Sequence, residues 1–244
     1  MTSPTTVAAP VSRRERARAA TIEEIKSTAL DLMRDGGTTD VRFTDIARVM
    51  GMTPPALYRY FADRDELLTA LITDAYDDLG AQVAASRDGV PDDDLYGRWA
   101  AAAESYRAWA HREPQQFALI LGMPVPGYAA DVEGPTSEAA KRAMSQLSAL
   151  FVEAAGRGQL REPLIQDVDS ALLTCADDKH PELNGVLSPA SFQAMLQAWA
   201  SLHGFTSLEA YGHLDWLTPE ARDSLFLSQV ELIAKTSGLP ATLT

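Results

Sequence analysis

Arginines gather near the start of the sequence, and their chemistry suits an anionic partner. Within residues 1–22 the only acidic residue is Glu15, and the basic residues are Arg13, Arg14, Arg16 and Arg18. A guanidinium group can hold a phosphate through several N–H donors, so a basic arm of this kind can follow the backbone of DNA or enter its minor groove. The alternative is a soluble, disordered tail in which the arginines have no role.

The charge of the whole chain hides this local excess. The net charge is −13, which by itself argues against binding to nucleic acids. Residues 1–72 contain ten Lys/Arg and ten Asp/Glu, whereas residues 73–244 contain eleven and twenty-four. A neutral first part with a basic arm can therefore meet phosphates while an acidic body faces away from them.

The composition is that of an ordinary globular protein. Of 244 residues, 46% are hydrophobic and 23% are charged, which argues against disorder. Cys175 is the only cysteine, so a disulfide framework and a four-thiolate zinc site are excluded, and a reducing compartment is favoured. The sequence has no apolar run long enough for a membrane helix and no apolar leader, so we expect a cytoplasmic protein.

Helix signals fill the chain after residue 19, and the predicted fold is all-α. Thr21 and Glu24 form a capping-box pair at the start of a first helix, which Gly36 and Gly37 end. Between them an apolar stripe recurs at helical spacing: Ile22, Ile25, Ala29, Leu32 and Met33. Residues 1–19 are predicted to be a disordered basic arm.

Two short helices are predicted next, with a glycine turn between them. Thr44 caps the first, over residues 45–50, and Thr53 with Pro54 opens the second, which runs to about Phe61. A small residue, a turn glycine and an apolar residue follow in order: Ala47, Gly51 and Leu57. This is helix-turn-helix spacing, which would place the second short helix in a major groove, although many helical bundles contain a similar pattern.

The residues themselves are more specific than the spacing. Residues 43–61, FTDIARVMGMTPPALYRYF, followed by ADRDELL at 62–68, closely resemble the DNA-binding signature of TetR-type transcriptional repressors. The resemblance covers about residues 20–70. It implies an all-α, homodimeric protein that is usually regulated by a small ligand.

The resemblance also implies roles for individual residues. Thr44 matches a hydroxyl that contacts phosphate, and the start of the recognition helix matches at Thr53, Pro54 and Ala56. Pro54 departs from the commoner pattern, in which a polar base-reading residue stands at this position. The double proline either leaves readout to other groups or serves only to start the helix.

Further roles follow from the end of the recognition helix. Tyr58 and Tyr60 match ring residues that reach phosphates, and Arg59 matches a variable position that contacts a base or a phosphate. Arg64 matches a lysine that holds a phosphate at the start of the fourth helix. Arg13 and Arg14 of the arm complete the predicted DNA contacts.

The C-terminal part is predicted to be a helical bundle for ligand binding and dimerisation. From the fourth helix onward we expect helices at about 63–86, 93–112, 114–122, 136–157, 165–178, 188–204 and 218–236. The predicted units are residues 1–19, 20–68 and 69–244.

A second resemblance lies in this C-terminal part. Trp199, His203 and Gly204 resemble the Trp-x-x-x-His-Gly motif of one subgroup of TetR-type proteins. Trp199 and His203 share one helix face and could contact a ligand or a metal. The alternative is a packed tryptophan and a hydrogen-bonded histidine that end the helix before Gly204.

By the same resemblance the last two helices would form a four-helix bundle across a two-fold axis. Their candidate interface residues are Phe192, Met195, Leu196, Trp199, Leu225, Leu227, Val230, Leu232 and Ile233. A place in the core is an equally good interpretation for some of them.

An apolar ligand pocket is predicted in the middle helices. The candidate lining residues are Trp99, Tyr106, Trp109, Phe117, Met123, Phe151 and Cys175. Aromatic and methionine residues at helical spacing also suit a plain core, so that alternative stays open.

The sequence offers no support for an enzyme. It lacks the HExxH, GxSxG and P-loop motifs, and its histidines show no metal-ligand spacing, so we predict no catalytic residue, metal or cofactor. We predict a homodimeric repressor that a small-molecule effector releases from a palindromic operator in double-stranded DNA, with no membrane partner. The alternative is a helical interaction protein or ligand sensor that has lost DNA binding.

Overall fold

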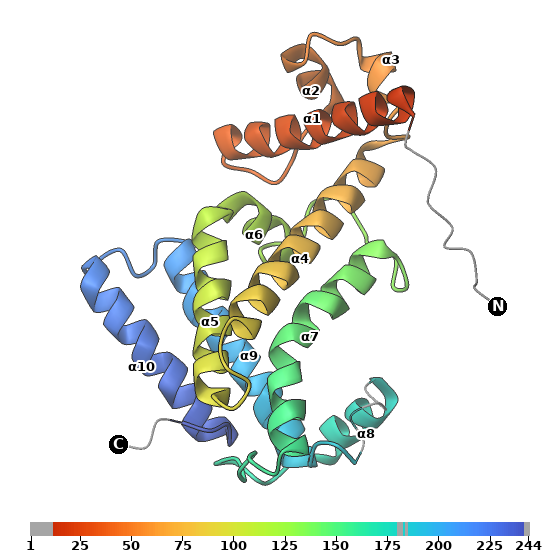
Figure 1. Ribbon diagram of the computed structural model, residues 1–244. Coiled ribbons are helices and arrows are strands. Elements are labelled where there is room, and N and C mark those ends of the chain that lie inside the picture. Colours follow the sequence, from red (N-terminus) through yellow and green to blue (C-terminus); the bar gives the residue numbers. More distant parts are fainter. Residues whose placement is uncertain (1–11, 180–182, 184, 242–244) are drawn as a thin grey trace, which may run out of the picture.

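The computed structural model describes residues 12–179, 183 and 185–241 and confirms the all-α prediction. Figure 1 shows α1 to α3 at one end of the molecule, with α4 running from them into a larger helical body. The helices are α1 (Arg13–Gly36), α2 (Phe43–Val49), α3 (Pro54–Leu57), α4 (Arg64–Asp88), α5 (Leu95–Arg112), α6 (Pro114–Leu121), α7 (Pro135–Gly156), α8 (Ser170–Lys179), α9 (Pro189–Ala210) and α10 (Pro219–Ser237). None of these helices is long and apolar enough to cross a membrane.

The start of α1 differs from the prediction. The capping box is Ser12 with Glu15, not Thr21 with Glu24: the Ser12 hydroxyl accepts from the Glu15 N–H at 3.2 Å, and the Glu15 carboxylate accepts from the Ser12 N–H at 2.7 Å. Both pairs have the same spacing, and the intervening Arg/Ala-rich stretch is itself a good helix former. Residues 13–19 are therefore helical rather than a disordered arm, and residues 1–11 lie outside the described part.

Two apolar clusters divide the molecule, and α4 contributes to both. Ile25, Met33, Ile46, Leu57 and Leu68 belong to the cluster of the N-terminal helices. The second cluster fills the body and includes Leu79 and Val83 of α4. The predicted unit boundary after residue 68 thus falls inside a continuous helix.

The segment around the end of α6 joins these two clusters. Leu119 and Val125 pack into the N-terminal cluster, whereas Phe117, two residues before Leu119, lies in the cluster of the body. The Tyr76 hydroxyl of α4 donates to the Ile120 carbonyl at 2.9 Å. A displacement of α6 would therefore disturb the packing of α1 to α4.

Some helix ends differ from the predicted ones. α3 is a single turn, because the chain continues through Tyr60 with three-residue turn bonds instead of helical ones. α9 does not end at Gly204 but continues to Ala210, because Phe205, Thr206 and Glu209 are buried. Burial of these residues outweighs the cost of a helical glycine, about 1 kcal/mol. α8 begins at Ser170, later than predicted.

Candidate nucleic-acid interface

The turn between α2 and α3 is built as helix-turn-helix spacing requires. Ile46, Ala47 and Leu57 are buried, which fixes the two helices on α1 and α4. Gly51 has a φ of 64°, in the left-handed region that favours glycine, and the Met52 N–H donates to the Ala47 carbonyl at 2.8 Å. This left-handed turn joins α2 to α3.

The start of α3 presents few groups that could donate to a base. Thr53 is exposed, and its side chain makes no capping hydrogen bond to α3, so the hydroxyl is free of that role. Pro54 and Pro55 are exposed and lack N–H groups, while Ala56 is half-buried. The surface at this point is apolar apart from Thr53.

We call residues 53–60, which include α3, the recognition turn. Its end is richer in polar groups than its start. Tyr58 is 56% exposed, with its ring tilted against Phe43 at a centroid distance of 5.2 Å. Arg59 is exposed, and Tyr60 is half-buried. The Arg18 guanidinium lies 5.3 Å from the centre of the Tyr60 ring, and its Nη1 donates to the Arg59 carbonyl at 3.1 Å. α1 thus contacts the end of the recognition turn directly.

The start of α2 presents an exposed arginine that is not among the predicted DNA contacts. α2 begins one residue before Thr44, so the predicted capping role of Thr44 is wrong, although its hydroxyl is exposed as a phosphate contact requires. Arg42 occupies the cap position and is also exposed. Its position two residues before Thr44 was the available signal. Arg48 is exposed too, but it pairs with Asp45 at 3.0 Å.

Arg64 has protein partners instead of an open position. Its Nη2 lies 2.7 Å from the Asp40 carboxylate, its Nε donates to the Val41 carbonyl at 3.3 Å, and its Nη1 donates to the Pro126 carbonyl at 3.4 Å. Asp40 and Val41 precede α2, whereas Pro126 follows α6. Arg64 therefore ties the N-terminal helices to the segment after α6 in this structure.

The predicted ligand-pocket residues do not form one group. Trp99, Tyr106, Trp109, Phe117 and Phe151 are at most 1% exposed and form part of the core of the body. Met123, in contrast, is 84% exposed, and Cys175 is exposed as well, so neither belongs with them. Both lie outside the tightly packed helix faces, Met123 in the loop after α6 and Cys175 on α8.

The indole nitrogens of the buried tryptophans have partners within the chain. Trp99 donates to the Val230 carbonyl at 3.0 Å, and Trp109 donates to the Asp78 carboxylate at 2.7 Å. These bonds indicate a structural role, because a buried N–H without a partner would be costly.

An aromatic cluster in the body joins the predicted pocket residue Tyr106 to Trp199 and His203 of the Trp-x-x-x-His-Gly motif. The Tyr106 hydroxyl lies 2.9 Å from His203 Nδ1, and the Trp199 ring stacks on the His203 ring at 5.5 Å and 4°. Phe117 of α6 contacts both Tyr106 and His203 through its ring. Burial lowers the pKa of His203 and raises the pKa of Tyr106, so both groups are neutral near pH 7. In the described part of the chain, no group of three or more His, Cys, Asp or Glu residues could hold a metal ion.

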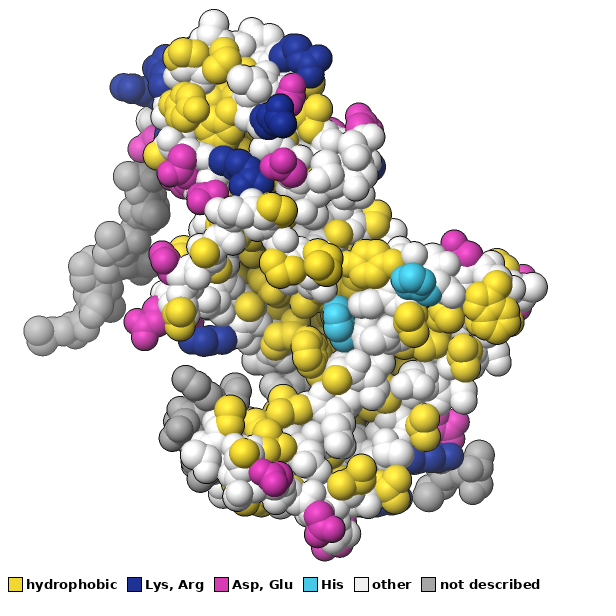
Figure 2. All heavy atoms as spheres, turned by 180° about the vertical axis from the view of Figure 1, so that it is seen from behind, with side chains coloured by type: hydrophobic (Ala, Val, Ile, Leu, Met, Phe, Trp, Pro, Cys, Tyr) yellow, Lys and Arg dark blue, Asp and Glu magenta, His cyan; other side chains and the backbone are white. Residues whose placement is uncertain are grey.

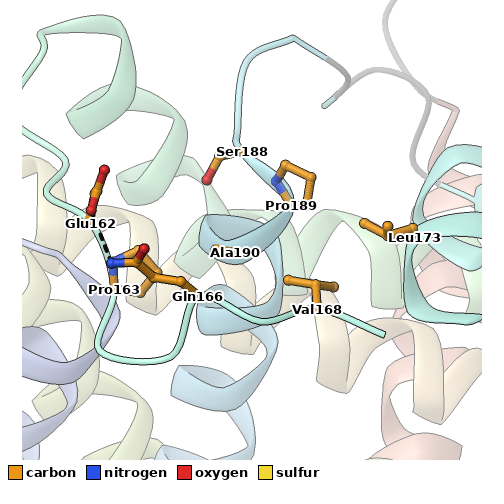
Figure 3. A pocket seen from close by; sticks show the side chains of 8 residues that line it. All are labelled: Glu162, Pro163, Gln166, Val168, Leu173, Ser188, Pro189 and Ala190. Carbon is orange, nitrogen blue, oxygen red and sulfur yellow. Dashed lines mark hydrogen bonds between the residues drawn. The ribbon is translucent and has the colours of Figure 1, made fainter. Parts of the chain in front are cut away.

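A cavity of about 360 Å³ lies elsewhere, between the loop after α7, α8 and the start of α9 (Figure 3). Its walls are Pro163, Val168, Leu173, Pro189 and Ala190, with Glu162, Gln166 and Ser188 as the polar groups. Gln166 Nε2 donates to Glu162 at 3.0 Å. The cavity contains none of the predicted pocket residues and lies at the end of the body away from α3 (Figure 1).

The predicted dimer-interface residues separate into two groups. Phe192, Met195, Val230 and Ile233 are 7%, 8%, 2% and 3% exposed, so they belong to the core of the protomer. The residues that remain accessible are Leu196, Trp199, Leu225, Leu227 and Leu232. Because apolar residues lie on both the inner and the outer faces of α9 and α10, only their burial in the structure separates core residues from accessible ones.

Comparisons with known proteins agree with this architecture. Residues 25–71 match the family described as "Bacterial regulatory proteins, tetR family", and residues 99–233 match "Tetracyclin repressor-like, C-terminal domain". The chain is 32% identical over 197 residues to the HTH-type transcriptional regulator Rv1816 of Mycobacterium tuberculosis, covering 78% of this chain and 82% of that protein. The same values hold for the HTH-type transcriptional regulator Mb1846 of Mycobacterium bovis.

Solved structures show the same fold. The putative regulatory protein SCO4313 matches with a TM-score of 0.70 and 32% identity, covering 91% of this chain and 98% of that one. A protein of unknown function from Rhodococcus sp. RHA1 matches with a TM-score of 0.63 and 22% identity, covering 87% and 92%. The second match supports the fold alone. The narrower resemblance to a Trp-His-Gly subgroup stays a prediction.

Proposed function

This chain belongs to the tetR family of bacterial regulatory proteins, whose members are transcriptional regulators and not enzymes, and on this premise we propose that it is a homodimeric repressor. Each protomer would place α3 in a major groove of a palindromic operator, with half-sites about one helical turn apart. A small apolar effector would release the protein from DNA. Such a regulator acts where bacterial DNA is found, in the cytoplasm.

The observation that carries this proposal is the exposed row of groups at the α3 end of the molecule. Thr44, Thr53, Tyr58 and Arg59 are exposed there, on helices that a buried apolar cluster holds in place. A phenol and a hydroxyl can each donate one directed hydrogen bond to a phosphate oxygen. Since Pro54 and Pro55 donate none, base readout would depend on Arg59, on apolar contact with thymine methyl groups and on DNA shape.

The distribution of charge is compatible with local contact to DNA. Figure 2 shows Lys and Arg side chains gathered on the N-terminal helices, at the end of the molecule where α3 lies. The net charge of −13 arises in residues 73–244, which hold eleven basic and twenty-four acidic residues. Contact with phosphates must therefore be confined to the N-terminal helices, and affinity should fall steeply with salt.

The outer face of α9 supports the proposal of a dimer. From Pro189 to Leu208 this helix contains no Asp, Glu, Lys or Arg, although 23% of the chain is charged. A second acidic copy could approach such a face without direct repulsion. The residues that follow one another at four-residue spacing on this face are Leu196, Ala200, Gly204 and Leu208, with Gly204 only partly exposed and the other three exposed.

Gly204 has no evident role within one chain. A Cβ added to it would meet nothing within 4 Å, and its backbone is helical. A helical glycine costs about 1 kcal/mol relative to alanine, so a close crossing of a second α9 at this point would explain it. The ridge has a leucine at each end, Leu196 and Leu208, and small residues between them. Two such ridges related by a two-fold axis could cross at the small residues.

An effector bound in the body could change the position of the N-terminal helices through α6. Phe117 contacts Tyr106 and His203, and the end of the same helix packs into the N-terminal cluster at Leu119. Arg64 binds the Pro126 carbonyl beyond α6 and Asp40 before α2. A ligand that prefers a displaced α6 would shift the spacing of the two α3 helices, and would weaken DNA binding only by its difference in affinity for the two states. α4 would carry part of the change, because it belongs to both clusters.

Selection from a pool of random duplex DNA by the purified protein tests this function. We expect enrichment of one palindrome, a complex with two protomers per duplex, and a steep loss of affinity with salt. A folded, dimeric protein that enriches no sequence would overturn the proposal and favour a helical sensor or interaction protein that no longer reads DNA.

A further inference from the structure

The first eight residues of α1 form an exposed extension of the helix. Every residue from Ser12 to Ala20 is exposed, and the first buried residue of α1 is Ile25. We call residues 13–20 the α1 extension. It contains Arg13, Arg14, Arg16 and Arg18 against the single acid Glu15. A helix segment that is exposed on all sides gains little from packing on its own chain, so another partner is the simplest reason for its length.

Arg18 connects this extension to the recognition turn. Its Nη1 donates to the Arg59 carbonyl at 3.1 Å, and its guanidinium lies 5.3 Å from the Tyr60 ring centre. α3 itself is one turn long, and the chain after it is held by bonds from the Tyr60 and Phe61 N–H groups to the Leu57 carbonyl, at 2.8 and 3.1 Å. Arg18 therefore adds a hydrogen bond from α1 to the segment after α3, where few helical hydrogen bonds hold the backbone.

The helix geometry then decides where the other arginines point. At about 100° per residue, Arg14 lies about 40° from Arg18 around the helix axis and one turn further out. Arg13 lies about 140° from Arg18 and so points to another side. Figure 1 shows the N-terminal end of α1 beside α3. Arg14 thus lies on the side of α1 that contacts Tyr60, one turn further out, whereas Arg13 lies on another side.

We propose that the α1 extension is a rigid second element of the DNA interface, in which Arg18 positions the recognition turn and Arg14 binds a phosphate next to it. The inference rests on the proposed DNA-binding function. It differs from a disordered basic arm in one respect: a helix commits each arginine to one direction, whereas an arm would use all of them alike. Arg18 is a positioning residue here and donates to protein, not to DNA.

The first experiment compares Arg14→Gln with the matched control Arg13→Gln, which removes the same charge one residue away. Affinity for the duplex enriched from the random pool is titrated against salt. We expect Arg14→Gln to reduce the slope of log affinity against log salt by about 0.9, the value for one phosphate contact, and Arg13→Gln to change it little. Equal changes for the two variants, or none for Arg14→Gln, would overturn the rigid-element proposal.

The second experiment tests the positioning role in Arg18→Met, with Arg34→Met at the other end of α1 as the control for a lost arginine. Without DNA, amide hydrogen exchange at Tyr60 and Phe61 should be faster in Arg18→Met and unchanged in Arg34→Met. With DNA, Arg18→Met should lose at least about tenfold in affinity for the selected duplex with an unchanged salt slope. A slope reduced by about 0.9 with unchanged exchange would make Arg18 a phosphate contact and overturn its positioning role.

The two proposals fail in different ways. If the wild-type protein enriches no sequence, the repressor function fails, while faster exchange in Arg18→Met would still support the contact between α1 and the recognition turn. If the wild-type protein selects a palindrome but Arg14→Gln and Arg13→Gln behave alike, the function stands and the α1 extension is an ordinary basic tail.

Discussion

The two tyrosines of the recognition turn have different surroundings although they are two residues apart. Tyr58 is 56% exposed and rests on Phe43, whereas Tyr60 is half-buried beneath Arg18. The Tyr58 hydroxyl is therefore the better placed of the two for a phosphate oxygen. A sequence pattern assigns both tyrosines one role, because neighbours from a distant part of the chain are not visible in it.

Tyr58→Phe should weaken binding to operator and unrelated duplex alike, by about 1–2 kcal/mol for a lost hydrogen bond to a charged group. Phenylalanine keeps the ring contact with Phe43, so folding should not change. A fluorescence titration at fixed salt measures the effect, with Tyr96→Phe on α5 as the control. Equal affinity of Tyr58→Phe and the wild-type protein would remove this hydroxyl from the interface.

His203 predicts a dependence of stability on pH. Burial lowers its pKa below the ordinary value of 6.5, so the unfolded chain binds the proton more readily than the folded one. The stability it contributes is fully present above pH 6.5 and is lost as the pH falls through the lower, folded-state pKa.

His203→Gln should remove this part of the acid sensitivity. Urea unfolding of the variant and the wild-type protein between about pH 7.5 and 5 measures it. The free energy of unfolding of the wild type should decline more steeply toward low pH than that of the variant. Parallel curves would show that His203 titrates normally.

Pairs of helices in the body are joined by a buried ion network that no local pattern reveals. Arg107 of α5 donates to both oxygens of Glu209 on α9, at 2.6 and 2.7 Å, and to Asp223 of α10 at 2.8 Å. His111 Nε2 lies 3.1 Å from the same Glu209 carboxylate. The Glu209 side chain is only 2% exposed, so its charge depends on these partners.

Glu209→Gln should destabilise the fold by about 3 kcal/mol, because it leaves the Arg107 guanidinium short of its main counter-charge. Glu231→Gln is the control. It breaks a surface pair with Lys235 at 2.5 Å and should cost less than about 1 kcal/mol. Denaturant unfolding at pH 7 measures both. Similar small costs for the two variants would mean that Asp223 compensates fully.

The whole molecule consists of an N-terminal helical end and an acidic body, which share helix α4 and the segment around the end of α6. Leu119 and Val125 of this segment lie in the N-terminal cluster, and Ile120 packs against both clusters. At this scale the outer face of α9 is an uncharged surface on a strongly acidic protein. Both features suit a regulator in which two copies must hold their α3 helices at a set distance.

Gly204→Leu should weaken the dimer about 10- to 100-fold, because a large side chain at a close helix crossing costs about 1–3 kcal/mol. Within one chain the new side chain would enter open space, so the melting temperature of the monomer should not fall. Sedimentation over a range of concentrations measures the dimer. Gly156→Leu, at another helical glycine with nothing within 4 Å of an added Cβ, is the control. Equal association of the two variants would place the dimer interface elsewhere.

The sequence by itself determined the helical class, most helix positions and the helix-turn-helix, because caps, prolines and apolar periodicity act over a few residues. Tertiary structure decided that Gly204 lies inside α9, and that Phe192 and Val230 are core while Trp199 is accessible. It also gave Arg64 and Arg18 protein partners. These outcomes depend on burial and on contacts between distant segments, which a local pattern does not contain.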